Sequence, residues 1–540
     1  MDRLEAGAGV SDEDTQGDAN EGAVMGLTAT LCERIAAARF EDLPHETIAA
    51  ARRLVLDGLA VGVAGVAEEE AVSILARCMR AMGGRPVATV IGCDFRIDPV
   101  RAAALNGAAM HVLDFEPMWS PATHALSTTL PVALALAEVR GASGRDVLTA
   151  LVKGIELQGW LRQASGQHSF DVLPFHPPGL VGPMGAVATA SHLLGLDPGR
   201  MACAFGIAAS RSGTVWSNCG TMTKSTHCGQ AAAMGLEAAL LAEAGFTGDA
   251  ATFESPQGYA ATFNRDTFNP DELLRYGTAP WRVVQPGYAI KMFPSQFGTH
   301  FAITAGLDLH ARIPPAGAIR AVQLVSPCLP YVDRPRPETG LSGKFSLQYT
   351  LAAALLDGKV AIRTFTEERL NAPDMQALLG KMTLRQDPAI PPKFEAMHVR
   401  VSVELTDGSV LEARCDGPRG VWGQAPISET EHLIKARDCL AAALEPEAVE
   451  RCVALATRID EQPPTQVREL MALIGAGSPG SWERGSTSTY PSTGQPSVRI
   501  ARLSHAKAEG HTAPLVCLTT ETGALKNHRS HRVNGDEAVG

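Results

Sequence analysis

The spacing of apolar residues predicts helices over most of the first half of the chain. In residues 147–155, Val, Leu and Ile recur at the three- and four-residue steps of one helix face. Ser143 and Asp146 precede this stretch with the spacing of a capping box. Most segments between residues 25 and 246 show the same helical period and are rich in Ala and Gly. We therefore expect closely packed helices, many of them buried on several sides.

A different pattern in the second half predicts strands. Residues 398–416 alternate Val and Leu with polar residues and contain the turn dipeptide Asp407–Gly408, which is typical of a β-hairpin. Residues 318–326 have strand composition, and the segment "SLQYTLAAALLDG" between these two stretches has a helical period. Residues 288–420 are therefore predicted to form a smaller α+β domain.

The helical period returns after this region, which indicates that the α+β domain is an insertion. Residues 421–474 contain a second capping box that begins at Ser428, and we expect them to rejoin residues 25–287 in one helical domain. The predicted fold is therefore mainly α, with a large all-helical domain and a smaller inserted α+β domain. Residues 1–24 and 475–540 lack an apolar period and are predicted to be disordered, the latter as a tail.

The charge of the chain narrows the classes of binding partner. The 540 residues carry a net charge of -11, and the isoelectric point is about 5.8. A nucleic-acid-binding protein would need a basic surface, so we expect no nucleic-acid partner. An acidic chain that binds an anion must do so in a local basic pocket.

Cysteine usage and hydropathy predict a cytoplasmic protein. The eleven cysteines are an odd number, are scattered along the chain, and include no CxxC pair and no metal-type spacing. This pattern fits a reducing compartment. The longest apolar run, residues 54–67, contains Asp57 and several Gly and is too short to span a bilayer, so we expect no membrane partner.

The first candidate for chemistry is "HVLDFEPMWSPATH", residues 111–124, which joins two apolar helical stretches. Asp114 beside His111 and His124 would be suited to proton transfer. The alternative interpretation is that Asp114 caps a helix and that both histidines are satisfied surface groups.

Two further stretches suit an anionic ligand. His176 precedes two prolines and a glycine-containing helix, although a stiff turn with an incidental histidine is an alternative. Lys224 and His227 lie at the start of a long Ala-rich helix, where the helix dipole, free N–H groups and the lysine charge add together. The alternatives are an N-cap with a solvated lysine, or a Schiff-base lysine, for which no phosphate cup or pyridinium partner is evident.

Two later stretches place polar groups in loops or at a helix start, and both are also compatible with ordinary solvated loops. The residues concerned are Lys291, Ser295, Gln296, His300, Tyr331, Arg334 and Lys344.

The stretch "LNGAAMHVLDFEPMWSPATH" resembles the signature N-G-x-x-x-H-x-x-D-x-(D/E)-x-x-x-x-x-P-x-x-H of the MmgE/PrpD family. "FHPPGLVGPMGAVATA", "TKSTHCGQAAAMG", "FPSQFGTHFA" and "YVDRPRPETGLSGKFSLQYTLAAALLDG" follow in the order of that family, so the resemblance covers about residues 25–470. The family includes 2-methylcitrate dehydratase, cis-aconitate decarboxylase and iminodisuccinate epimerase. The resemblance implies a helical domain closed by an α+β lid, an active site in the cleft between them, a homodimer, and no requirement for a metal or an organic cofactor.

The resemblance also assigns residues to the site. Five residues match positions that line the substrate pocket in the decarboxylase branch of the family: Asp114, His124, His176, Lys224 and Tyr331. His227 follows Lys224 at the spacing usual in the family. Two positions depart from that branch. Met118 stands where it has Thr, and Gln296 stands where it has His. Both departures remove a polar or titratable group and leave the substrate open.

Residues and resemblance together predict a cofactor-independent lyase of a small di- or tricarboxylate. The expected chemistry is proton transfer α to a carboxylate, with a 2-methylcitrate dehydratase-like reaction as the leading hypothesis. A cis-aconitate decarboxylase-like enzyme, an epimerase or isomerase, and a catalytically silent metabolite binder are the alternatives. The expected catalytic residues are Asp114, His124 and Tyr331; the expected substrate-binding residues are His176, Lys224 and His227; no metal ligand is expected.

Overall fold

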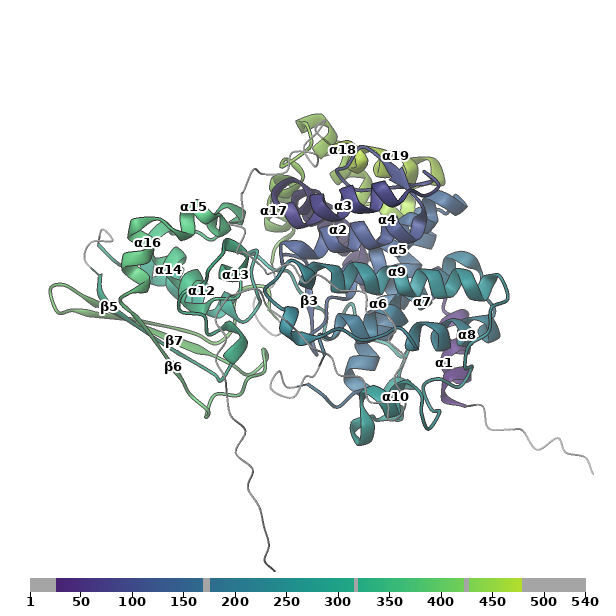
Figure 1. Cartoon of the computed structure of the whole chain (residues 1–540), viewed down its shortest axis with the longest axis horizontal. Coiled ribbons are helices and arrows are strands. Elements are labelled where there is room, and N and C mark those ends of the chain that lie inside the picture. Colours follow the sequence, from purple (N-terminus) through teal and green to yellow (C-terminus); the bar gives the residue numbers. More distant parts are fainter. Residues whose placement is uncertain (1–25, 169–174, 315–318, 422–426, 478–540) are drawn as a thin grey trace, which may run out of the picture. The chain divides into compact units, whose positions relative to one another are not determined.

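The computed structural model describes residues 26–168, 175–314, 319–421 and 427–477. The predicted disordered segments, residues 1–24 and most of 475–540, lie outside these ranges. Helices make up most of the described chain, which confirms the mainly α prediction (Figure 1).

The first half of the chain forms helices with very short strands between them. The helices are α1 (Leu27–Ala37), α2 (His45–Glu68), α3 (Glu70–Met82), α4 (Pro99–Val112), α5 (Ala125–Arg140), α6 (Gly144–Ala164), α7 (Pro178–Leu194), α8 (Pro198–Ala209), α9 (Thr223–Glu243), α10 (Tyr259–Phe263) and α11 (Pro270–Leu273). The strands β1 (Ala88–Thr89) and β2 (Arg96–Ile97) pair with each other. The predicted capping box is present, since Ser143 and Asp146 bond reciprocally at the start of α6.

Close packing of small residues brings α9 against α4 and α7 (Figure 1). A side chain at Gly229 of α9 would place its Cβ 2.1 Å from the carbonyl oxygen of Ala104 in α4, and one at Gly107 would lie 2.7 Å from the carbonyl oxygen of Ser127 in α5. Only glycine allows these approaches. They place the last turn of α4 near the first turn of α9, where the candidate residues lie.

The second half contains a four-stranded sheet covered by helices. Its strands are β5 (Ile319–Ser326), β6 (Met382–Gln386), β7 (Val399–Leu405) and β8 (Val410–Cys415), in the order β6-β5-β7-β8. The neighbouring helices are α12 (Thr299–His310), α13 (Gly340–Gly343), α14 (Leu347–Asp357), α15 (Glu367–Leu370) and α16 (Pro373–Leu379). The predicted hairpin is present, with Val399 opposite Cys415 and Glu404 opposite Val410.

A separate pair of short strands ties the segment before this sheet to the joint between α4 and α5. Strand β3 (Met118–Trp119) pairs antiparallel with β4 (Tyr288–Ala289). Residues 288–289, which the sequence pattern assigned to the α+β domain, therefore bond directly to the helical part. This pairing brings the residues after β4 close to the joint.

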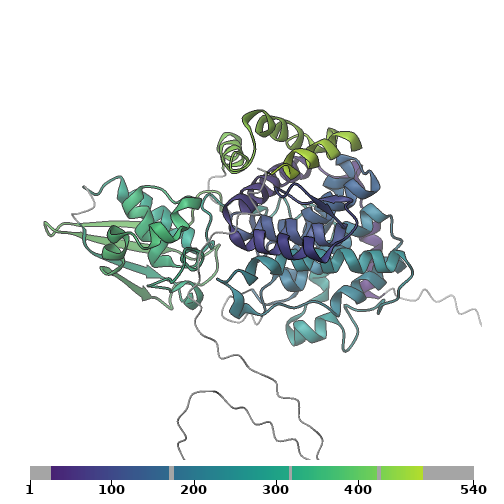
Figure 2. The same ribbon diagram turned by 45° about the horizontal axis from the view of Figure 1, so that its top comes forward.

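The last three described helices contact helices of the first part of the chain. They are α17 (Glu429–Leu440), α18 (Pro446–Ala456) and α19 (Pro464–Gly475), and α17 and α18 contact α2 while α19 contacts α5 (Figure 2). The carbonyl of Gly475 accepts a hydrogen bond from the backbone N–H of Asp94 at 3.0 Å. The described residues therefore extend slightly past the predicted boundary at residue 474. None of the described helices combines the length and apolarity needed to cross a bilayer.

Candidate active site

The joint between α4 and α5 turns two carboxylates into the protein interior. Helix α4 ends at Val112, and Asp114 then adopts a left-handed backbone conformation with φ of 52°, which Asp tolerates better than most residues. Asp114 and Glu116 are both buried, and His124 directly precedes α5. His111 and His124 are buried as well. The alternative interpretation, in which both histidines are surface groups, is therefore wrong.

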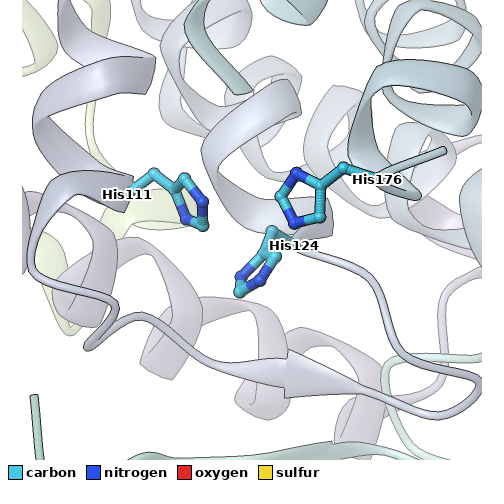
Figure 3. Close-up of side chains that lie close together, drawn as sticks. All are labelled: His111, His124 and His176. Carbon is cyan, nitrogen blue, oxygen red and sulfur yellow. The ribbon is translucent and has the colours of Figure 1, made fainter. Parts of the chain in front are cut away.

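The joint forms one wall of a cavity of about 40 Å³. The cavity is lined by Asp114, Met118, Ala122, Thr123, His124, His176, Pro177, Pro178, Trp216, Cys219, Lys224, Gln296, Tyr331 and Phe345. Five of the six predicted site residues are in this lining; His227 is the exception. Figure 3 shows the rings of His111, His124 and His176 directed toward a common space, although they come from the end of α4, the start of α5 and the loop before α7.

Asp114 lies between two lysines. Lys224 Nζ, in the first turn of α9, is 3.1 Å from Asp114 Oδ2, and Lys291 Nζ contacts Asp114 Oδ1. Burial raises the pKa of the Asp114 carboxyl, but the charges of Lys224 and Lys291 outweigh it and hold that pKa well below its usual value. Asp114 is therefore ionised. Lys224 is only 7% exposed, so the alternative interpretation of a solvated lysine is wrong.

Glu116 is the carboxylate that faces the histidines. Its Oε1 contacts His111 Nδ1 and lies 2.8 Å from His124 Nδ1 and 3.1 Å from Ser127 Oγ. Burial raises the pKa of Glu116, whereas its interactions with the two histidines lower it, and the net pKa lies well below the usual value. The sequence prediction placed Asp114 beside His124 as its carboxylate partner. In the structure Glu116 takes that place.

The two histidines beside Glu116 are uncharged at neutral pH. Burial, followed by the nearby charge of Lys224, lowers the pKa of His111 to about 4, and burial also lowers the pKa of His124. His111 Nε2 lies 3.0 Å from Lys224 Nζ, so a neutral His111 accepts there and donates from Nδ1 to Glu116. If His124 likewise holds its proton on Nδ1, its Nε2 is left as a proton acceptor.

His176 and His227 form a second histidine pair. Their Nδ1 atoms are 3.0 Å apart, and His176 faces the cavity while His227 lies behind it in α9. Burial lowers the pKa of His227 to about 4 and lowers that of His176 well below its usual value. Trp216 packs against His176 with ring centroids 5.4 Å apart.

The wall opposite the joint comes from the second half of the chain. Gln296 Nε2 donates to the hydroxyl of Tyr331 at 2.9 Å, and Gln296 Oε1 accepts from the backbone N–H of Gly298 at 2.6 Å. These two bonds fix the orientation of the Gln296 amide. Burial raises the pKa of Tyr331, so its hydroxyl keeps its proton. Met118 and Phe345 add apolar surface to the same cavity.

The remaining residues of the later stretches make structural contacts outside the cavity lining. Ser295 Oγ bonds to Thr299 Oγ1 at 2.9 Å, and His300 Nε2 is 3.3 Å from the carbonyl oxygen of Ser295. Arg334 donates to the carbonyl of Cys219 at 3.1 Å. Lys344 Nζ lies 2.5 Å from Glu69 Oε1.

The histidine cluster also has donor atoms close enough for a metal ion. One nitrogen from each of His111, His124 and His176 lies within 4.8 Å of the other two. However, both nitrogens of His111 are already engaged by Glu116 and Lys224, and the Lys224 ammonium would repel a cation. The donor set therefore suits proton transfer next to an anion better than metal binding.

Comparisons with known proteins agree with this architecture. Residues 29–271 match the MmgE/PrpD N-terminal domain, and residues 293–461 match the MmgE/PrpD C-terminal domain. The chain belongs to the MmgE/PrpD family. The family predicted from the sequence motifs is thus confirmed.

Two kinds of relative within the MmgE/PrpD family resemble the chain. Cis-aconitate decarboxylase of Mus musculus is 32% identical over 447 residues, which cover 81% of this chain and 91% of the relative. The Homo sapiens protein of the same name is 31% identical, with coverage of 81% and 92%. The 2-methylcitrate dehydratase of Cupriavidus necator is 25% identical over 405 residues, with coverage of 67% and 79%.

Glu116 is the main site residue that sequence reasoning missed. It occupies the acidic position two residues after Asp114 in the family signature, so the signal was present. Lys291 was named only among the polar residues of the later stretches, without a role in the site. Its contact with Asp114 depends on the pairing of β3 with β4, two strands of two residues each that carry almost no sequence signal.

Proposed function

We propose that this protein is a lyase that removes a proton α to a carboxylate of a small polycarboxylate. The observation that carries the proposal is the Glu116–His124 pair beside the Asp114–Lys224 pair, with His124, Asp114 and Lys224 in the lining of one cavity. In the first pair, the His124 imidazole is a base with the Glu116 carboxylate next to it. In the second pair, Asp114 holds the Lys224 ammonium group, which can bind an anionic substrate. The names of the relatives, decarboxylases and dehydratases of carboxylates, support the same class.

His124 is the proposed base. Its Nε2 takes the proton from carbon, and the charge that develops on the imidazole is stabilised by Glu116 at Nδ1. Lys224 and His176 bind the substrate carboxylates and stabilise the enolate-like state. Asp114 holds the Lys224 ammonium in place and keeps it charged.

Tyr331 is the proposed proton donor. In a dehydration the C=C bond forms as the C–O bond breaks, and Tyr331 protonates the departing hydroxide to give water. The raised pKa of Tyr331 keeps this proton available, and the Gln296 amide fixes the hydroxyl from one side. His227 supports His176 from behind through the Nδ1 contact.

A hydroxy-polycarboxylate with an apolar substituent, such as 2-methylcitrate, is the leading substrate. Met118, Ala122, Trp216 and Phe345 give the cavity an apolar wall that suits a methyl group. Decarboxylation is the second candidate, because the relatives at 31–32% identity are named cis-aconitate decarboxylases. In that reaction the C–C bond to a carboxylate breaks, CO₂ leaves, and the carbanion takes up a proton.

Proton NMR in D₂O with purified protein distinguishes these reactions. Loss of the methine proton signal of 2-methylcitrate, with collapse of its methyl doublet to a singlet, indicates dehydration, and release of labelled CO₂ from cis-aconitate indicates decarboxylation. Deuterium incorporation at carbon without either product indicates an epimerase. The proposal fails if no di- or tricarboxylate reacts or exchanges, and thermal stabilisation without turnover would then favour a metabolite-binding protein. His124→Ala is the control for activity from a contaminant.

We further propose that the protein is a homodimer of the cytoplasm, as the family resemblance and the cysteine pattern suggest. Light scattering of the full chain measures the first point, and a mass of one chain would contradict it. Fractionation of the source cells tests the second.

A further inference from the structure

The backbone of the joint is held by two lysines that approach from different parts of the chain. Lys291 Nζ donates to the carbonyl of Asp114 at 2.9 Å, and Lys435 Nζ donates to the carbonyl of the next residue, Phe115, also at 2.9 Å. Lys291 follows β4, whereas Lys435 lies in α17, more than 300 residues after the joint. Two consecutive peptide carbonyls therefore each accept from a buried ammonium group.

Lys435 is itself fixed by a buried network. Its Nζ lies 2.9 Å and 3.2 Å from the two carboxylate oxygens of Asp57 in α2, and His432 Nε2 lies 3.0 Å from Asp57 Oδ1. The ammonium also lies 4.1 Å from the ring centroid of Phe115. Asp57 is 1% exposed, and Lys435 is 6% exposed. Both the carbonyl and the ring of Phe115 are thus held by one side chain.

The position of Phe115 matters because its neighbours on both sides face the site. Asp114 pairs with Lys224, and Glu116 contacts His124. Residues 113–117 belong to neither α4 nor β3, so regular secondary structure does not fix them. A shift of this backbone would move both carboxylates together relative to the base and the substrate-binding lysine. Misplacement of catalytic groups by about 1 Å can cost about 100-fold in rate.

We propose that Lys435 is a positioning residue for the site, acting through the Phe115 carbonyl and held by Asp57. The inference rests on the proposed function, because it assigns to α17 the task of holding Asp114 and Glu116 in register with His124. Lys435 does not line the cavity, so its effect must pass through the joint.

The test compares two variants that differ only at Lys435. Lys435→Met alone would leave Asp57 without its cation, and breaking a buried pair in this way can unfold a protein. Asp57→Asn keeps the lysine and its bond to Phe115, but it also breaks the buried pair, so its cooperative melting transition must be verified before kinetics are compared. Asp57→Asn combined with Lys435→Met removes the bond to Phe115 without leaving a buried charge. Lys153→Met removes a buried lysine of α6 that bonds to His192 and serves as the control elsewhere in the helical core.

We expect the double variant to lose tenfold or more in kcat relative to Asp57→Asn, with KM changed by less than about threefold, the pattern of a lost transition-state geometry. Equal kcat in the two variants would overturn the proposal. The proposal would also be overturned if the double variant lost no more kcat than Lys153→Met at a matched decrease in melting temperature, because general destabilisation would then explain the loss.

A second readout does not depend on turnover. The ¹⁵N imidazole signals of His111 and His124 report their contacts with Glu116, and we expect them to move in the double variant but not in Lys153→Met. Unchanged signals would overturn the positioning role even if no substrate is found. If the unmodified protein catalyses no reaction but the signals shift in the double variant, the result contradicts the proposed function and leaves the positioning role of Lys435 supported.

Discussion

At the scale of single residues, two carboxylates two positions apart in the sequence have different surroundings. Asp114 lies between two lysines, and Glu116 lies between two histidines. The first is paired with lysine ammonium groups, whereas the second faces imidazoles that are neutral at pH 7 and can accept a proton. Asp114 is therefore suited to hold the proposed substrate-binding lysine, and Glu116 is suited to assist the proposed base.

His124→Ala should lower kcat by roughly 100-fold or more, which is the usual contribution of a general base. KM should change much less, because the carboxylate contacts of Lys224 and His176 remain. Steady-state kinetics on the identified substrate measures both values. If the variant kept near-normal kcat, proton transfer would have to be assigned to His176 or Tyr331.

The pH profile should depend on Glu116. His124 acts as a base only when neutral, so activity falls as the pH falls through its pKa. Burial lowers that pKa, which places the acidic limb of kcat/KM below the ordinary imidazole value of about 6.5. Glu116 opposes this effect by raising the pKa, so Glu116→Gln should move the limb to still lower pH and reduce kcat.

The control for Glu116→Gln is Glu138→Gln, since Glu138 is a buried glutamate that accepts from Thr89 and lies outside the cavity lining. Its pH profile should match that of the unmodified protein. An acidic limb that stays in place in Glu116→Gln would show that another carboxylate sets the titration of the base.

At the scale of elements, the glycine contacts between helices set the positions of the site residues. Helix α9 carries Lys224 and His227 at its start, and its approach to α4 depends on Gly229. The carbonyl oxygen of Ala104 belongs to rigid helix backbone and cannot move aside alone. The distance between α4 and α9 therefore controls the contact of Lys224 with Asp114.

Gly229→Ala should destabilise the protein by about 1–3 kcal/mol, the usual range for overpacking, even though Ala is the better helix former. Activity should fall as well, because α9 must move and Lys224 moves with it. Denaturant unfolding and kinetics check the two effects. Gly199→Ala is the matched control, since its Cβ in α8 would meet only Asp197 Oδ1 at 3.3 Å; an equal loss of stability there would contradict the packing argument.

Local signals account for the parts of the fold that were predicted correctly. The capping boxes at Ser143 and Ser428 and the hairpin turn at Asp407–Gly408 each depend on residues a few positions apart, and all three are present. The approach of Lys291 and Lys435 to the joint spans 177 and 320 residues. No local periodicity encodes such contacts, so the contacts of these two lysines with the joint were not predictable from the pattern.

At the scale of the whole molecule, the proposed division into residues 25–287, 288–420 and 421–474 stays a prediction. All four strands of the larger sheet come from residues 319–415, in agreement with an inserted α+β domain. Limited proteolysis should cut near these boundaries first and leave the helical part intact. Cleavage within α4–α9 before any cut near residue 288 would contradict the division.

Stability should fall in mild acid because several histidines are buried and uncharged. Burial lowers the pKa of His111, His192 and His227 to about 4, below the unfolded value of about 6.5. The unfolded chain therefore binds more protons as the pH falls from about 6.5 to about 4, and the free energy of unfolding decreases over that window.

Thermal unfolding as a function of pH measures this dependence. His192→Asn, which removes a histidine outside the cavity, should reduce the slope of melting temperature against pH between about 6.5 and 4. A melting temperature that is constant across this window would contradict the assignment of these groups as neutral in the folded state.

The cavity of about 40 Å³ has a consequence for the rate of ligand association. One water molecule needs about 10–15 Å³, so the cavity in this form has room for a few waters and is too small for a polycarboxylate. A substrate that binds there needs a widened form of the cavity, and its apparent dissociation constant increases by the inverse of the population of that form. In stopped-flow mixing, the observed binding rate should accordingly level off at high ligand concentration, at the rate with which the cavity opens.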